Sequence, residues 1–425
     1  MWEGLARTRR QDRVLHGTAK AANVVFGLIA FPLWVLGQLL GGRVRNVLMR
    51  LERREARSLP VPPPAERSMA ALMSNLEAVP QDLQRHPLAE LRFGMGDISN
   101  FVIAQQREGA VLGYRYPAQF KDHIFEGAGG ERIAASIALQ EAARPGLIVV
   151  HGLFTSSRFD YVRQIGVRAF YDWGFNVAAI DLRSFGMTEL SSSAPSTAGW
   201  KEGEDLLALA RYLKELGATS VGLLGISLGG SSVLNAGHHA ESADVVDGGI
   251  LAVSPPAVPK DVWGRLSEPV SRTHPRYPLH RAFQAALISR VRSGRWPPEA
   301  EDMERVMEHV SAPYYDVSAE EIWTRAAGRD HVADAKVPLL VLHPEDDQIV
   351  KVDQARILEQ AASGNDLVRV WILPAGQHGL LETADRDWTQ TVYRTFFERW
   401  ASYAERPRLP GGGDAEVVYS GAESG

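Results

Sequence analysis

The stretch Val221-Gly222-Leu223-Leu224-Gly225-Ile226-Ser227-Leu228-Gly229-Gly230 decides the fold, because it joins a short apolar run to a glycine-rich turn. The run Val221–Leu224 is typical of a buried strand, and the residues after it are compatible with a helix. Residues 225–229 match G-x-S-x-G, in which small residues on either side of the serine permit a sharp strand–turn–helix connection. This setting predicts that Ser227 is a nucleophile. The alternative is a helix start that is merely rich in glycine and serine.

A serine hydroxyl reacts poorly at neutral pH, so it needs a general base, which an acid holds in one tautomer. In chains with a nucleophile on such a turn, the acid follows the serine and the histidine comes last. His378 is the last histidine of the chain, and its loop follows the strand candidate Val368–Ile372. We therefore predict that His378 is the base. The alternative is a histidine in a surface loop.

The acid is expected in the loop after the strand candidate Leu339–Leu342, where Glu345, Asp346 and Asp347 are adjacent. A run of three acids usually includes solvated or capping carboxylates, so only one of them is expected to face the histidine. We predict Asp347, which precedes the x-Ile-Val segment that commonly starts the next helical turn. Asp346 is the second candidate.

Backbone N–H groups are expected to form an oxyanion hole, because the tetrahedral intermediate of acyl transfer carries a negative oxygen. One donor is predicted at Leu228, which follows the nucleophile. The other is predicted at Leu153, in the loop His151–Phe154 that follows the strand candidate Leu147–Val150. In this loop His151 is interpreted as a residue that holds the loop rather than as a second base.

Short apolar runs alternate with helical patterns along the chain, which is typical of parallel βαβ architecture with helices on both faces of a sheet. The expected strands are residues 147–150, 177–180, 221–224, 250–253, 339–342 and 368–372. Stretches near 114–125 and 132–139 are expected to form a leading antiparallel hairpin. The long interval between the strands at 250–253 and 339–342 far exceeds an ordinary connection, so we predict an inserted helical cap.

The composition excludes several classes of protein. With 425 residues, 45% of them hydrophobic and 23% charged, the chain is long enough for one large globular domain with appendages. The net charge of −5 gives no basic field, so nucleic acid is not an expected partner. The chain has no cysteine, which excludes disulfides, cysteine nucleophiles and cysteine-based metal sites.

The run from Ala21 to Gly42 carries no charge and is long enough to cross a bilayer core of about 30 Å. Its apolar residues surround the helix, which indicates burial on all sides, in lipid or in protein. Apolar residues then recur at helical spacing from Val44 to Leu51 among arginines, a pattern typical of helices on anionic lipid. We predict membrane association through residues 21–58. The alternatives are a helix packed against protein and a signal peptide.

The motifs together resemble the α/β-hydrolase superfamily and, more narrowly, the membrane-anchored, embryogenesis-associated branch of α/β-hydrolase domain proteins. The resemblance rests on His151-Gly152-Leu153, Tyr161-Val162-Arg163, Asp181-Leu182-Arg183-Ser184-Phe185-Gly186, Gly225–Gly229, Tyr314-Tyr315-Asp316 with Ser318, Asp346-Asp347 and Gly376–Gly379. The branch usually has Arg-Gly where this chain has Arg183-Ser184, and Asp-Asp-Pro where it has Asp346-Asp347-Gln348. The resemblance implies carboxylesterase, lipase or phospholipase activity without a metal or another cofactor.

The patterns divide the chain into four parts, namely a membrane-association segment (1–58), a linker with lead-in helices (59–110), an α/β-hydrolase domain (111–405) with a cap at about 256–336, and a disordered tail (406–425). The predicted function is hydrolysis of carboxylic esters, including lipid esters, through an acyl-enzyme. The alternatives are an acyltransferase or thioesterase with the same triad, and a non-catalytic membrane-bound binding protein. Five aromatic or basic residues of the predicted cap have two possible roles: they line an acyl pocket, or they form the cap's own core. These residues are Trp263, Arg265, Tyr277, Phe283 and Trp296.

Overall fold

The computed structural model describes residues 66–83, 116–268, 271, 277–300, 302–379 and 381–402. The predicted membrane-association segment 1–58 and the predicted tail 406–425 lie outside these ranges, and so does most of the predicted linker 59–110. Within the described ranges, no helix is both long enough and apolar enough to span a bilayer.

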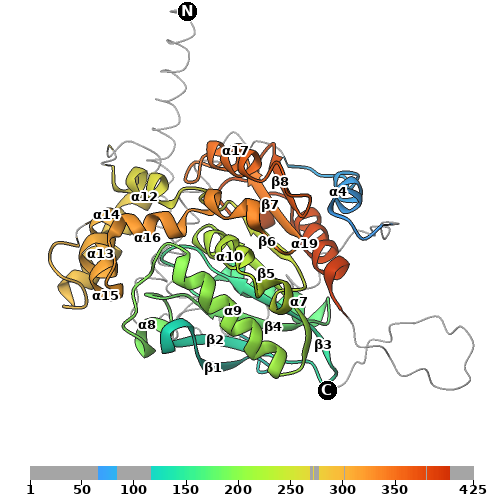
Figure 1. Cartoon of the computed structure of the whole chain (residues 1–425), viewed down its shortest axis with the longest axis horizontal. Coiled ribbons are helices and arrows are strands. Elements are labelled where there is room, and N and C mark those ends of the chain that lie inside the picture. Colours follow the sequence, from blue (N-terminus) through green and yellow to red (C-terminus); the bar gives the residue numbers. More distant parts are fainter. Residues whose placement is uncertain are drawn as a thin grey trace, which may run out of the picture.

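The described strands form one eight-stranded sheet in the order β1-β2-β4-β3-β5-β6-β7-β8 (Figure 1). Their bounds are β1 Lys121–Glu126, β2 Arg132–Ala138, β3 Arg144–Val150, β4 Asn176–Asp181, β5 Ala218–Ile226, β6 Ile250–Val253, β7 Leu339–Pro344 and β8 Val368–Leu373. The pairs β1–β2 and β2–β4 are antiparallel, and all other neighbours are parallel. The predicted α/β architecture, with its mostly parallel sheet, is therefore confirmed.

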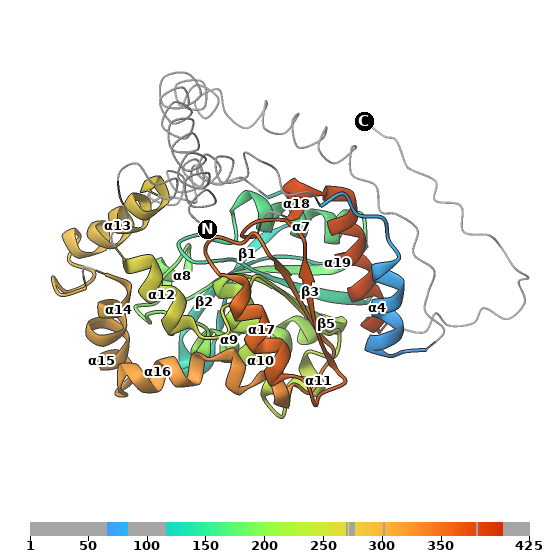
Figure 2. The same ribbon diagram turned by 90° about the horizontal axis from the view of Figure 1, so that it is seen from above.

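Alternate residues of each central strand face opposite layers of helices, as the two-residue period of a strand requires. On one face, Val221 and Leu223 of β5 belong to the hydrophobic core that also contains Leu206 of α9 and Val233 of α10. On the other face, Leu224 of β5 belongs to the core that contains α7 and α19 residues. Figure 2 shows these helices on opposite sides of the sheet. Burial on both faces explains why the strands are almost continuously apolar.

The helices are α4 Met69–Glu77, α7 Asp160–Tyr171, α8 Thr188–Ser191, α9 Trp200–Glu215, α10 Leu228–His238, α11 Ser242–Val245, α12 Pro259–Ser267, α13 Tyr277–Arg292, α14 Met303–Val306, α15 Ala312–Tyr315, α16 Ala319–Ala326, α17 Val352–Ala361, α18 Leu381–Ala384 and α19 Arg386–Trp400. Between β6 and β7 the chain forms α12 to α16, which gather at one end of the sheet (Figure 1) and are called the cap below. The α19 residues Trp388, Val392, Phe396 and Trp400 are buried, as their spacing predicts.

Candidate active site

Ser227 lies at the turn between β5 and α10, where its backbone adopts φ 58° and ψ −116°. This conformation is unfavourable for a residue with a side chain, and such strain is concentrated at functional sites. The turn closes only because the residues two positions before and two positions after Ser227 are glycines. A Cβ atom on Gly225 would lie 2.1 Å from the carbonyl oxygen of Gly229, and one on Gly229 would lie 2.5 Å from that of Val150. The G-x-S-x-G spacing is therefore a steric requirement of this turn.

His378 and Asp347 come together from the loops after β8 and β7. The Nδ1 atom of His378 lies 2.8 Å from Oδ2 of Asp347 and donates a hydrogen bond to it. The other carboxylate oxygen, Oδ1, accepts the backbone N–H groups of Ile349 and Val350, each at 2.9 Å. Burial alone would raise the pKa of Asp347, but the adjacent His378 and these hydrogen bonds outweigh burial and hold the pKa below its ordinary value. Asp347 is therefore held as a carboxylate that orients the imidazole.

The neighbouring Asp346, the second candidate for the acid, has a different partner. Its Oδ1 accepts the backbone N–H of Gln377 at 2.8 Å, next to His378. The structure thus brings Asp347 to the histidine ring and Asp346 to the backbone of the histidine loop. Sequence reasoning did not assign this second contact, because a bond to a backbone N–H leaves no pattern in the side chains.

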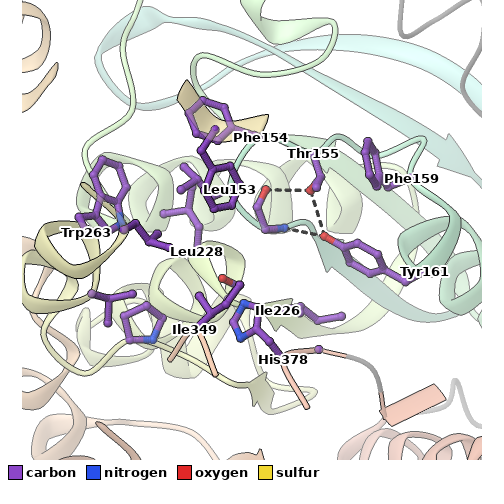
Figure 3. Close-up of a pocket in the computed structure, with 17 residues that line it drawn as sticks. Leu153, Phe154, Thr155, Phe159, Tyr161, Ile226, Leu228, Trp263, Ile349 and His378 are labelled. Carbon is purple, nitrogen blue, oxygen red and sulfur yellow. Dashed lines mark hydrogen bonds between the residues drawn. The ribbon is translucent and has the colours of Figure 1, made fainter. Parts of the chain in front are cut away.

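The two predicted oxyanion donors lie beside Ser227. Leu228 is the first residue of α10, and Leu153 lies in the loop after β3. Among the described residues, neither backbone N–H has a hydrogen-bond acceptor. Leu153, Ser227, Leu228 and His378 all line one pocket (Figure 3). Two free N–H groups beside a serine are what an oxyanion hole requires.

The pocket has a volume of about 110 Å³ and is mostly apolar. Among the described residues, no Asp, Glu, Lys or Arg side chain lines it. Its walls come from the loop after β3, the start of α7, the β5–α10 turn, the cap and the loops after β7 and β8. Of the cap residues considered from sequence, Trp263 and Phe283 line the pocket, whereas Arg265 and Trp296 do not. The side chain of Tyr277 lies outside the described part. The Phe283 ring packs at 5.4 Å from that of Phe154, which also lines the pocket.

His151 is buried and neutral, as its two backbone contacts show. The N–H of Leu182 donates to Nε2 at 3.0 Å, so the proton must be on Nδ1, which lies 2.7 Å from the carbonyl oxygen of Gly152. Burial lowers the pKa of the ring, which favours this neutral form. His151 therefore joins the β3 loop to the end of β4 and has no nitrogen left to act as a base.

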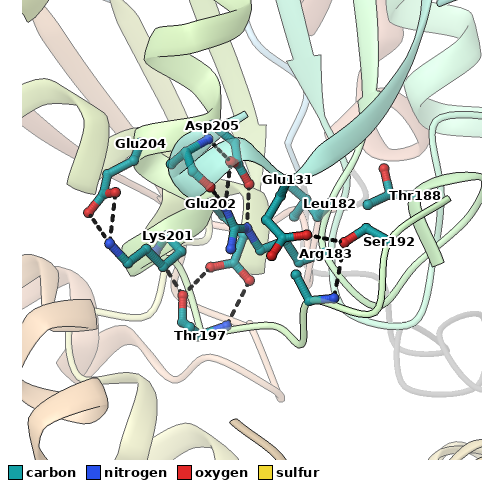
Figure 4. Close-up of polar contacts among 12 residues, drawn as sticks. Glu131, Leu182, Arg183, Thr188, Ser192, Thr197, Lys201, Glu202, Glu204 and Asp205 are labelled. Carbon is teal, nitrogen blue, oxygen red and sulfur yellow. Dashed lines mark hydrogen bonds and ion pairs between the residues drawn. The ribbon is translucent and has the colours of Figure 1, made fainter. Parts of the chain in front are cut away.

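Arg183 joins the end of β4 to helix α9 by a buried ion pair (Figure 4) and joins it to the cap by a hydrogen bond to Tyr315. Arg183, after β4, donates from Nε and Nη2 to the two carboxylate oxygens of Asp205 at 2.7 and 2.8 Å. Its Nη1 donates to the hydroxyl of Tyr315 in α15 at 2.8 Å. The next residue, Ser184, has φ 69°, a backbone conformation that favours glycine.

Within the described ranges, no group of three or more His, Asp or Glu side chains is arranged to hold a metal ion. Imidazoles do gather at the end of α10, where the ring of His238 stacks against His331 at 4.1 Å and lies 4.4 Å from His239. Stacked rings present their faces to one another, which is not how nitrogens converge on a metal.

A mostly parallel sheet, a strained serine at a strand–helix turn and an Asp–His pair from later strand ends define the α/β-hydrolase fold. Residues 147–390, more than half of the chain, match the model of the alpha/beta hydrolase family. The chain therefore belongs to the alpha/beta hydrolase family.

Similar solved structures include hydrolases from three organisms. An esterase of Pyrococcus furiosus is 17% identical, with 66% of this chain and 92% of that chain covered and a TM-score of 0.48. The esterase domain of a Rhodothermus marinus protein is 22% identical, with coverage of 66% and 99% and a TM-score of 0.42. A puromycin-hydrolyzing peptidase of Mycobacterium tuberculosis is 15% identical, with coverage of 68% and 40% and a TM-score of 0.44. No curated protein matches the chain.

Proposed function

We propose that the protein is a serine hydrolase that cleaves carboxylic ester bonds, with Ser227 as nucleophile, His378 as base and Asp347 as the orienting acid. The observation that carries this proposal is the 2.8 Å hydrogen bond between His378 and Asp347, beside the pocket that Ser227 and His378 line together. A general base held in one tautomer is what a serine needs in order to react at neutral pH.

In the proposed reaction, Ser227 Oγ attacks the ester carbonyl carbon while its proton passes to Nε2 of His378. The C–O bond to the alcohol breaks, the alcohol leaves with that proton, and the acyl group stays on Ser227. A water molecule then loses a proton to His378 and attacks the acyl-enzyme, which releases the carboxylic acid and returns the proton to Ser227. The backbone N–H groups of Leu153 and Leu228 hold the oxyanion in both steps.

The proposed substrates are esters with an uncharged, apolar acyl group, including lipid esters. The pocket beside Ser227 is lined by aromatic and aliphatic side chains, and no Asp, Glu, Lys or Arg of the part of the chain that the structure describes lines it to pair with a charged substrate. Burial of apolar surface in such a pocket contributes roughly 25 cal/mol per Å². Acyl groups that fill the apolar walls are therefore expected to react faster than charged ones.

Membrane attachment through residues 21–58 is proposed on sequence grounds, namely an uncharged run followed by a basic amphipathic segment. Fractionation of cells that express the whole chain, or the chain without residues 1–58, tests it. The whole chain is expected in the membrane fraction and the shortened one in the soluble fraction. Equal partition of the two would contradict the anchor.

Membership of the membrane-anchored, embryogenesis-associated branch is also proposed. Two residues that carry this resemblance, Arg183 and Tyr315, are hydrogen-bonded to each other at 2.8 Å, although they are far apart in the sequence. The motifs thus contribute to one structural feature, the attachment of the cap.

A fluorophosphonate probe, which reacts with activated serines, tests the nucleophile. The wild-type protein is expected to be labelled, and Ser227→Ala is expected not to be. Ser293→Ala is the matched control, because Ser293 is an exposed serine that directly follows α13 in the cap. This variant should be labelled like the wild type. Equal labelling of wild type and Ser227→Ala would disprove the assignment, and a wild type without labelling would favour a non-catalytic binding protein.

A second assay separates a hydrolase from an acyltransferase. It compares the products formed from p-nitrophenyl esters in water alone with those formed when alcohol or thiol acceptors are added. Hydrolysis is expected to dominate in the presence of acceptors. A product that is mainly the transferred acyl ester would show that the same acyl-enzyme serves an acyltransferase.

A further inference from the structure

Two hydroxyl groups flank the loop that contains the proposed oxyanion donor Leu153. The phenolic oxygen of Tyr161, the second residue of α7, accepts the backbone N–H of Gly152 at 2.8 Å. The Thr155 hydroxyl donates to the carbonyl oxygen of Gly152 at 2.8 Å and lies 3.0 Å from the Tyr161 hydroxyl. Figure 3 shows this chain of hydrogen bonds at the edge of the pocket.

The protons in this chain have one consistent assignment. A carbonyl oxygen only accepts, so the single hydroxyl proton of Thr155 goes to Gly152. The Tyr161 hydroxyl then donates to the Thr155 oxygen while it accepts from the Gly152 N–H. Both backbone polar groups of Gly152 are thus held by side-chain hydroxyls, and each hydroxyl orients the other.

This arrangement determines the direction of the Leu153 N–H. The carbonyl of Gly152 and the N–H of Leu153 belong to the same planar trans peptide unit, so they point in opposite directions. The carbonyl oxygen is held by Thr155 at 2.8 Å and by Nδ1 of His151 at 2.7 Å. The peptide cannot rotate without loss of these hydrogen bonds. The Leu153 N–H therefore keeps its orientation, although no described residue accepts a hydrogen bond from it.

The clamped loop is close to the nucleophile. A Cβ atom placed on Gly152 would lie 3.3 Å from Cβ of Ser227 and 3.5 Å from the Tyr161 hydroxyl. Thr155 and Tyr161 also line the pocket that contains Ser227. A small rotation of the Gly152–Leu153 peptide would thus change the position of a donor directly beside the reacting carbonyl.

We propose that Thr155 and Tyr161 are positioning residues, whose paired hydroxyls orient the Leu153 N–H toward the oxyanion that forms at Ser227. This inference rests on the function proposed above. The hydrogen bonds to the Gly152 carbonyl also polarise the peptide, which strengthens the N–H as a donor. The pair acts through Leu153 and does not contact the oxyanion itself.

The test compares Thr155→Val and Tyr161→Phe, which remove one hydroxyl each and keep the shape of the side chain. Thr324→Val, on the exposed side of α16, and Tyr212→Phe, whose hydroxyl contacts His123 on β1, are matched controls. Each test variant is expected to lose about 10-fold to 100-fold in kcat for a p-nitrophenyl ester with KM nearly unchanged, somewhat less than loss of an oxyanion donor itself. Thr155→Ser, which keeps the hydroxyl, is expected to recover most of the activity.

A trifluoromethyl ketone, whose adduct with the serine carries an oxyanion, gives a readout that general loss of structure would not produce. The affinity of Thr155→Val and Tyr161→Phe for this ketone is expected to fall in proportion to their kcat. Their affinity for the corresponding unreactive amide is expected to stay unchanged. The double variant is expected to lose about as much as the stronger single variant, because the two hydroxyls act as one unit.

Two results would overturn the inference. One is wild-type kcat in both single variants. The other is a loss in Tyr161→Phe alone, which would mean that the phenol contacts the substrate directly. Failure of the proposed function looks different, because then the wild type itself shows neither ester turnover nor labelling at Ser227.

Discussion

His378 donates a hydrogen bond from Nδ1 to Oδ2 of Asp347 at 2.8 Å, and the acid just before it, Asp346, accepts the backbone N–H of Gln377 at 2.8 Å. Two adjacent acids after β7 therefore hold two adjacent residues after β8, one by its side chain and the other by its backbone. The first contact sets the tautomer of the proposed base, and the second sets the position of its loop.

The two contacts predict different effects of substitution by asparagine. Asp347→Asn replaces an acceptor-only carboxylate that faces the ring, so kcat for a p-nitrophenyl ester is expected to fall about 10⁴-fold, as in other serine triads. Asp346→Asn keeps an oxygen that can accept the Gln377 N–H, so its kcat is expected to stay near that of the wild type. Equal losses in the two variants would contradict the assignment of the acid.

The contact between Phe283 and Phe154 predicts a change in acyl specificity. Their rings lie 5.4 Å apart at the wall that the cap contributes to the pocket. Phe283→Ala opens this wall, so the ratio of kcat/KM for long over short acyl esters is expected to rise about tenfold or more, the scale of one or two methylene contacts. A series of p-nitrophenyl esters measures the ratio. Phe283→Leu keeps most of the volume and serves as the control, and an unchanged ratio in Phe283→Ala would mean that acyl chains do not reach this wall.

The sequence predicts the strands and the loops that carry the site better than it predicts the side-chain contacts. Buried strands are apolar on both faces, and a nucleophile turn requires glycines, so both leave clear patterns. The first strand of the expected hairpin, near 114–125, begins only at Lys121. The reason is a turn just before it, in which the backbone N–H of Phe120 donates to the carbonyl oxygen of Pro117. The residue type of the cap aromatics predicts burial but not what they face, so the sequence could not show that Trp263 lines the pocket whereas Trp296 is buried elsewhere. The roles of Thr155 and Tyr161 depend on backbone partners, which sequence patterns do not show.

The buried pair of Arg183 and Asp205 predicts a large effect on stability. Both side chains are 1% exposed. Burial alone would lower the pKa of Arg183, but the Asp205 carboxylate outweighs it and keeps the guanidinium charged. Arg183→Met leaves a buried carboxylate without its cation, so the free energy of unfolding is expected to fall by about 3 to 5 kcal/mol in urea titrations.

Two further variants separate this effect from a general effect of losing an arginine. The surface pair of Arg211 and Glu241 is 45% and 48% exposed, so Arg211→Met is expected to cost less than about 1 kcal/mol. The double variant Arg183→Met/Asp205→Leu removes both charges and is expected to be more stable than Arg183→Met alone. A double variant that is less stable than the single one would show that packing, and not the unpaired charge, dominates.

The stacked histidines at the end of α10 predict a loss of stability in acid. Burial, and then the charges that His331 and His239 would carry, lower the pKa of His238 from 6.5 to about 4. A hydrogen bond to the Asn235 backbone and the charge of Asp334 act in the opposite direction but are weaker. Between these two pH values the unfolded chain binds a proton that the folded protein excludes, so stability is lost as pH falls from 6.5 toward 4. His238→Gln cannot bind this proton, so its thermal midpoint is expected to fall less than that of the wild type across the same window. A parallel decline of the two midpoints would assign the acid sensitivity to other groups.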